Sequence, residues 1–119
     1  MAYDQFLAER ISFFFNTKNT RFNEKKMFGG LCFMINEKMC VGVLQNEVMA
    51  RIDPEIYDEA LSKDGCYEMN FTGRPMKGFV FLRDEAIDLD DDLHYWLQLA
   101  LDFNPKAKIS KKKKKKPGS

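Results

Sequence analysis

Apolar side chains near the start of the chain recur at the spacing of an amphipathic helix. Leu7, Ile11, Phe14 and Phe15 follow one another at intervals of four, three and one residues, with charged residues between them. This pattern predicts a helix over residues 4–17 that buries one side. The polar interval 16–23 would end the helix.

Three short apolar runs follow, and residues typical of turns separate them. The runs are 31–35, 39–44 and 48–52, and the turns are 36–38 and 45–46. Such closely spaced runs predict a meander of antiparallel strands, to which residues 24–28 could add a further short strand.

Aligning these strands through their turns predicts which side chains share a face of the sheet. Met34 is expected opposite Val41, and Val43 opposite Val48. The expected outer face then holds Phe33, Ile35, Cys40, Gly42, Leu44, Met49 and Arg51. This face is more apolar than a solvated one, so we expect either the protein's own helices or a second subunit to cover it.

A second helix is predicted after the meander. Asp53 can accept hydrogen bonds from free backbone N–H groups, and Pro54 suits the first helical position because no N–H is needed there. Asp64 and Gly65 would end this helix, since glycine readily takes the left-handed conformation common at helix ends.

Two strands and a last helix complete the predicted order. The strands lie near residues 67–71 and 78–83, with a turn at 72–75, and the helix runs from the acidic cluster at 90–92 to about residue 101. The order α-β-β-β-α-β-β-α predicts an α+β fold, with an antiparallel sheet of about five strands flanked by helices.

The charge of the chain is divided between an acidic body and a basic tail. Residues 1–105 carry a net charge of −7, whereas residues 106–119 contain eight lysines. We expect one folded domain over 1–105 and a disordered lysine-rich tail over 106–119. The tail is the candidate polyanion-binding segment, and weak, sequence-independent binding of nucleic acid is expected of it. Its central lysines are Lys111, Lys112, Lys113, Lys114, Lys115 and Lys116.

Residue types that carry catalysis or bind metals are scarce. The chain has one histidine, His94, and three cysteines, Cys32, Cys40 and Cys66, which lie in apolar strand-like surroundings without a CxxC pair. Thiols in such surroundings are poor nucleophiles, so a small cysteine-dependent enzyme is the least favoured alternative. We expect no catalytic residue, no cofactor and no metal. No apolar stretch is long enough to cross a bilayer, which predicts a cytoplasmic protein without membrane contact.

Several segments resemble the N-terminal domain family of the TfoX/Sxy competence regulators. They are EKKMFGGL at 24–31, CVGV at 40–43, RIDPE at 51–55 and NFTGRPMKG at 70–78. The resemblance runs from residue 1 to about residue 104. It implies an antiparallel sheet flanked by helices, similar to type III secretion chaperones. It also implies a bacterial cytoplasmic protein that helps to switch on DNA-uptake genes together with a cyclic-AMP-dependent activator.

The family offers no catalytic or cofactor residues, and its motif residues have structural explanations. These residues are Gly29, Gly30, Pro54, Gly73, Pro75 and Gly78. We therefore expect a non-enzymatic regulatory or adaptor protein that acts through contacts with an unidentified protein. The alternative is a protein held to nucleic acid by its tail. A homodimer is the alternative to cover by the protein's own helices, with its interface either on the sheet face of Phe33, Ile35, Leu44 and Met49 or on the final helix at Trp96.

Overall fold

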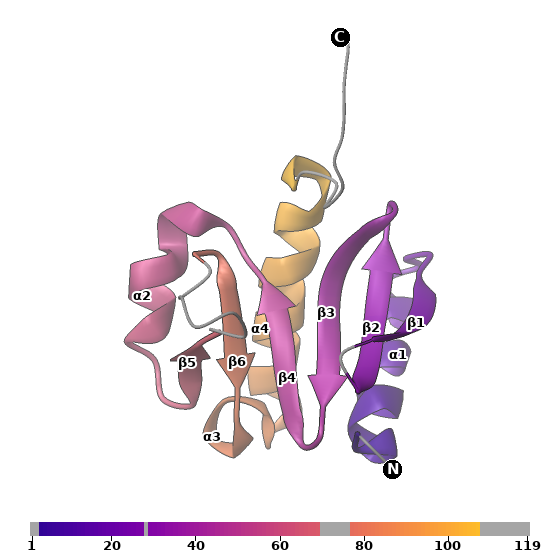
Figure 1. The fold of residues 1–119 in the computed structure, drawn as a ribbon, viewed down its shortest axis with the longest axis horizontal. Helices are drawn as coiled ribbons and strands as arrows, with labels where there is room; N and C mark the ends of the chain where they lie inside the picture. Colours follow the sequence, from indigo (N-terminus) through magenta and orange to yellow (C-terminus); the bar gives the residue numbers. More distant parts are fainter. Residues whose placement is uncertain (1–2, 28, 70–76, 108–119) are drawn as a thin grey trace, which may run out of the picture.

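Six antiparallel strands form one sheet in the order β1-β2-β3-β4-β6-β5 (Figure 1). The computed structural model describes residues 3–27, 29–69 and 77–107. The strands are β1 (Asn23–Met27), β2 (Gly30–Ile35), β3 (Lys38–Leu44), β4 (Glu47–Arg51), β5 (Cys66–Glu68) and β6 (Phe79–Leu82). The predicted α+β class is confirmed. The segment at 24–28 does contribute a strand, so the sheet has six strands rather than about five.

Two long helices, α1 (Gln5–Thr17) and α4 (Asp90–Phe103), cover one face of this sheet (Figure 1). Shorter helices are η1 (Pro54–Ile56), α2 (Tyr57–Leu61), α3 (Asp84–Ile87) and η2 (Asn104–Lys106). The helices α3 and η2 escaped prediction because one turn is too short to show a helical period. Within the part of the chain that the structure describes, no helix is long and apolar enough to cross a membrane.

Helix ends form where the sequence predicted them. The Asp4 carboxylate accepts hydrogen bonds from the N–H groups of Phe6 (2.9 Å) and Leu7 (3.2 Å), which caps α1. Asp53 caps η1 in the same way through the N–H of Glu55 (2.9 Å). Gly65 has φ +81°, the left-handed conformation expected after α2. Local side-chain chemistry therefore defines these boundaries.

The β2–β3 hairpin turns more tightly than the sequence predicted. Asn36 and Glu37 both have positive φ, 56° and 64°. Two consecutive left-handed residues form a two-residue hairpin turn, and Ile35 therefore pairs with Lys38. The prediction assumed a three-residue turn over 36–38, which was wrong.

An irregularity in the ladder then shifts the register of β2. It lies between Phe33 and Met34, so that Phe33 pairs with Val41. The predicted pairing of Met34 with Val41 was wrong by one residue, whereas the pairing of Val43 with Val48 is confirmed. Because successive side chains of a strand point to opposite faces, a one-residue shift exchanges the faces of β2.

The main core lies between the helix pair and the sheet. Three aromatic rings form a triangle in this core, with centroids 5.5–6.0 Å apart. They belong to Phe15 on α1, Phe22 directly before β1, and Phe33 on β2. In the middle of α1, the guanidinium of Arg10 forms a 3.0 Å ion pair with Asp90 at the start of α4. These contacts hold both helices on the same face.

The end of the folded chain is fastened to the β2–β3 hairpin by Asn104. Its side-chain amide donates to the carbonyl of Ile35 (3.1 Å) and accepts from the amide of Asn36 (2.8 Å). The ammonium of Lys38 donates to the Asn104 carbonyl (3.0 Å). The described chain reaches Ala107, which is buried, two residues beyond the predicted boundary at 105.

Candidate functional site

The sheet face opposite α1 and α4, here called the open face, is covered by neither long helix (Figure 1). Its side chains alternate along each strand with those of the main core. They are Asn23, Lys25, Cys32, Met34, Met39, Leu44, Glu47, Met49, Arg51, Tyr67, Phe79, Phe81 and Arg83, with Met69 just after β5.

Sulfur-containing side chains form the centre of the open face. Cys32, Met49 and Met69 are at most 3% exposed and pack together as a second, smaller core cluster. Four partly buried side chains pack against this cluster: Met34, Met39, Phe79 and Phe81. Gly42 lies beneath it, because a Cβ there would be 2.9 Å from the Met49 methyl carbon and 3.4 Å from the Cys32 sulfur. The three central side chains are buried, so only the partly buried side chains around them reach the surface, where the flexible and polarizable methionines can adapt to different apolar groups.

Cationic groups accompany these apolar side chains. Lys25 lies opposite Cys32 in the β1–β2 ladder. The Arg51 guanidinium carbon is 5.2 Å from the centroid of the Phe79 ring. Its Nη1 is buried and has no hydrogen-bond partner among the described residues, and burial lowers the pKa of this group. Arg51 therefore has donor capacity that the described part of the chain leaves unused.

A second arginine on the open face is already paired. The Nε of Arg83 is 2.8 Å from a carboxylate oxygen of Glu47, and its guanidinium carbon is 4.4 Å from the centroid of the Tyr67 ring. Tyr67 itself is 42% exposed. This corner of the open face is thus accessible but electrostatically satisfied.

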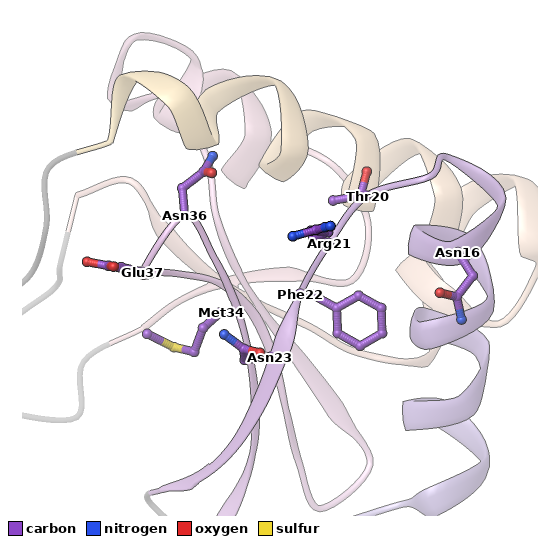
Figure 2. A pocket seen from close by; sticks show the side chains of 8 residues that line it. All are labelled: Asn16, Thr20, Arg21, Phe22, Asn23, Met34, Asn36 and Glu37. Atoms are coloured by element: carbon purple, nitrogen blue, oxygen red, sulfur yellow. The ribbon is translucent and has the colours of Figure 1, made fainter.

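A pocket of about 570 Å³ opens at the end of the sheet near β1 (Figure 2). Its wall includes Phe22, whose ring belongs to the main core, and Met34, which belongs to the open face. The pocket therefore bends around the edge of the sheet from the helix side to the open face. Polar groups complete its lining: Asn16, Thr20, Arg21, Asn23, Asn36 and Glu37. The lining has one exposed cation, Arg21, and one exposed carboxylate, Glu37, so its charge favours neither an anionic nor a cationic ligand.

The cysteines are unsuited to nucleophilic chemistry near neutral pH. All three are free and buried. Burial raises the pKa of the Cys32 and Cys66 thiols to about 11 and that of Cys40 to about 12. The reactive thiolate is therefore scarce at pH 7. Among the described residues, no three His, Cys, Asp or Glu side chains are grouped so that they could hold a metal ion.

The structure separates the residues of the predicted sheet interface, and it buries Trp96, which marked the alternative interface on the last helix. Phe33, Ile35 and Trp96 lie in the main core, and none is more than 4% exposed. Met49 and the half-buried Leu44 lie on the open face instead. The predicted common face was wrong because the register shift turns Phe33 and Ile35 toward the helices. The homodimer itself stays a prediction.

Two of the predicted motif glycines have clear structural roles. Gly30 lies so close to β3 that a Cβ would collide with the carbonyl oxygen of Val43. Gly78 has φ +94°, and its carbonyl accepts the N–H of Ile52 (2.7 Å). Gly73, Pro75 and Lys111–Lys116 lie outside the described residues.

Sequence reasoning did not identify the open face as a unit. It treated the methionines as core filler and did not single out Phe79 and Phe81. One signal was present: β6 reads FVFL, so large apolar residues occupy both of its faces. A strand of this kind needs cover on two sides, although the pattern alone does not say what covers each side.

The fold and the site together define a class: an α+β domain with one open antiparallel sheet, long helices on one face, and on the other face a buried sulfur-rich cluster surrounded by partly buried apolar side chains. The TfoX N-terminal domain family matches residues 17–104 of this 119-residue chain. The chain therefore belongs to the TfoX N-terminal domain family. The matched segment includes all six strands and α4. No curated protein and no solved structure matched the chain in the comparisons.

Proposed function

We propose that this protein is a non-enzymatic regulatory or adaptor protein of the cytoplasm, and that it binds a protein partner through the open face. The observation that carries the proposal is the combination of the sulfur-rich cluster with Arg51. The partly exposed side chains around the cluster can accept apolar groups of varied shape. The family supports a role in transcriptional regulation of competence.

The charges favour a partner segment that carries a carboxylate among apolar residues. The body of the chain is acidic overall, with a net charge of −7 over residues 1–105, yet the open face carries the exposed Lys25 and the partly buried Arg51 beside the Arg83–Glu47 pair. The buried Nη1 of Arg51 lacks a hydrogen-bond partner among the described residues. Binding must therefore uncover this nitrogen, and a carboxylate on the partner would then supply a charge-assisted hydrogen bond, the stronger kind in proteins.

Photo-crosslinking in cells that produce the protein tests this function with a matched control. Tyr67 on the open face and Tyr95 on α4 have nearly equal exposure, 42% and 45%. Each is replaced in turn by the photoreactive residue benzoylphenylalanine, and the adducts are identified by mass spectrometry. We expect a specific adduct with another protein from position 67 and none from position 95.

A second change tests the role of the cation. Arg51→Met keeps an apolar side chain of similar length but removes the guanidinium, and it should reduce the adduct at position 67 by at least about tenfold, since losing one partner of a charge pair weakens binding strongly. Equal adducts from positions 67 and 95 would contradict the proposal, as would an adduct that Arg51→Met leaves unchanged. An adduct with the mass of two chains would show self-association at the open face instead.

The tail supports nucleic acid as a second ligand class. Eight lysines in residues 106–119 could neutralise up to eight phosphates, which would give a log-log salt slope of roughly −7 for duplex DNA. The acidic body opposes this binding, so we expect it at low salt and not at about 150 mM. Deletion of residues 108–119 should abolish it, as measured by fluorescence anisotropy with labelled duplex DNA. Sequence-specific binding by the shortened chain would contradict this reading.

A further inference from the structure

Two phenylalanines on α1 are exposed on the side of the helix that faces away from the sheet. Phe6 is 70% exposed and Phe13 is 67% exposed. They are seven residues apart, about two helical turns, and therefore lie on the same side of the helix. The buried side of α1 carries a different set: Leu7, Ala8, Ile11, Phe14 and Phe15. The two exposed rings thus form an apolar stripe with no role in the main core.

The surroundings of the stripe extend it toward α4. Arg10, between the two rings in sequence, donates through one nitrogen, Nη2, to the carbonyls of Ile87 (2.9 Å) and Asp88 (3.3 Å) and to the Asp90 carboxylate (3.0 Å). These bonds bring the loop between α3 and α4 beside α1. Leu89 in this loop is 64% exposed. Leu89 is therefore a third exposed apolar side chain, next in sequence to the Asp90 that pairs with Arg10.

We propose that this stripe binds a second copy of the chain, with the two α1 helices antiparallel across a twofold axis between Glu9 and Arg10. A twofold interface requires a surface that complements itself. Residues 6, 9, 10 and 13 read Phe, Glu, Arg, Phe, which is nearly symmetric about that point. In this arrangement Phe6 meets Phe13 of the second copy, and the exposed Glu9 meets its Arg10.

Charge complementarity thus favours a second copy over an unrelated partner. Glu9 is exposed, and the three hydrogen bonds of Arg10 all use Nη2. The remaining guanidinium N–H groups can donate to Glu9 of the other chain without loss of the Asp90 ion pair. The interface lies on the helix side, so the open face stays available in the dimer. The proposal is independent of the function proposed above.

The expected dimer is weak. An exposed phenylalanine offers roughly 100–170 Å² at this exposure, so two rings and their neighbours on each chain bury on the order of 1,000 Å² in total. Interfaces of this size belong to transient complexes, for which a Kd on the order of 10 μM is expected. Sedimentation equilibrium from about 1 to 200 μM covers this range and should show a rise from 13.9 kDa toward twice that mass.

Substitution at the stripe tests the surface. Phe13→Asp and, separately, Phe6→Asp should raise the Kd by at least about 100-fold, because each puts a carboxylate opposite an aromatic ring. Both side chains are exposed, so circular dichroism should show unchanged folding. Tyr95→Asp is the control, since Tyr95 is also an exposed aromatic residue on a helix, and it should leave the dimer intact. A monomer at 200 μM would overturn the proposal, and so would a dimer that persists in both phenylalanine variants.

Cysteine crosslinking tests the register. Glu9→Cys puts a thiol next to the twofold axis, where two copies can form a disulfide. Asn16→Cys puts it six to seven residues away, so the two thiols would be separated by about 20 Å in an antiparallel pair. We expect rapid oxidation of Glu9→Cys to a covalent dimer and little from Asn16→Cys. The reverse result, or equal rates, would exclude antiparallel α1 pairing.

Discussion

Removal of the Asn104 side chain should destabilise the fold more than its position near the chain end would indicate. Asn104 is 2% exposed, and its amide bonds both the Ile35 carbonyl and the Asn36 side chain. Asn104→Ala removes two hydrogen bonds, each contributing about 1 kcal/mol, and leaves the carbonyl of a buried residue without its partner, which costs a further 1–3 kcal/mol or so. The expected loss in the free energy of unfolding is about 3–5 kcal/mol.

Urea unfolding followed by circular dichroism measures this loss, and a thermal scan should show a Tm lower by roughly 15–25 °C for a domain of this size. Asn36→Gly is the matched control. Glycine keeps the left-handed turn conformation at residue 36, and one of the two hydrogen bonds of the Asn104 amide is lost, which leaves its Oδ1 without that donor. The expected loss is smaller than for Asn104→Ala, about 1–2 kcal/mol. A loss below 1 kcal/mol for Asn104→Ala, or equal losses for both variants, would refute the reasoning.

Two further changes test the interior of the sheet. Burial raises the pKa of the Cys40 thiol to about 12. The protonated thiol therefore contributes its full share of the free energy of unfolding below about pH 9, and this share is lost as pH rises toward 12, by up to about 1.4 kcal/mol per pH unit. Urea unfolding between pH 9 and 11 should therefore show that the free energy of unfolding falls more steeply with pH in the wild-type protein than in Cys40→Val. Parallel pH profiles of the two proteins would argue against this. Gly30→Ala should cost at least about 2 kcal/mol, because the new methyl group meets the Val43 carbonyl, whereas Gly29→Asn should cost under about 1 kcal/mol, because φ is +76° there with open space around it. Similar melting temperatures for the two glycine variants would show that the close approach at Gly30 is unimportant.

Local chemistry made much of the fold readable from the sequence. The stripe of apolar residues predicted α1, and Asp4, Asp53 and Gly65 mark helix ends through bonds and backbone angles within a few residues. The meander followed from turn residues and alternating strands. These features depend on neighbours in sequence, so a pattern along the chain contains the necessary information.

The position of the functional surfaces depended on contacts that no local pattern contains. The left-handed pair Asn36 and Glu37 and the irregularity after Phe33 together moved β2 by one residue, which sent Phe33 to the main core and left Met34 on the open face. Because strand side chains alternate, one residue of register decides the composition of both faces.

The exposed rings on α1 show the same division between sequence and tertiary structure. The predicted buried stripe of α1 does not include Phe6 and Phe13, but the sequence could not show whether another element covers these two side chains. Only the packing of α1 against the sheet, with α4 beside it through Arg10 and Asp90, leaves those rings in solvent. Exposure is a property of the assembled layers, so the sequence alone determined the helix and the tertiary structure determined its free face.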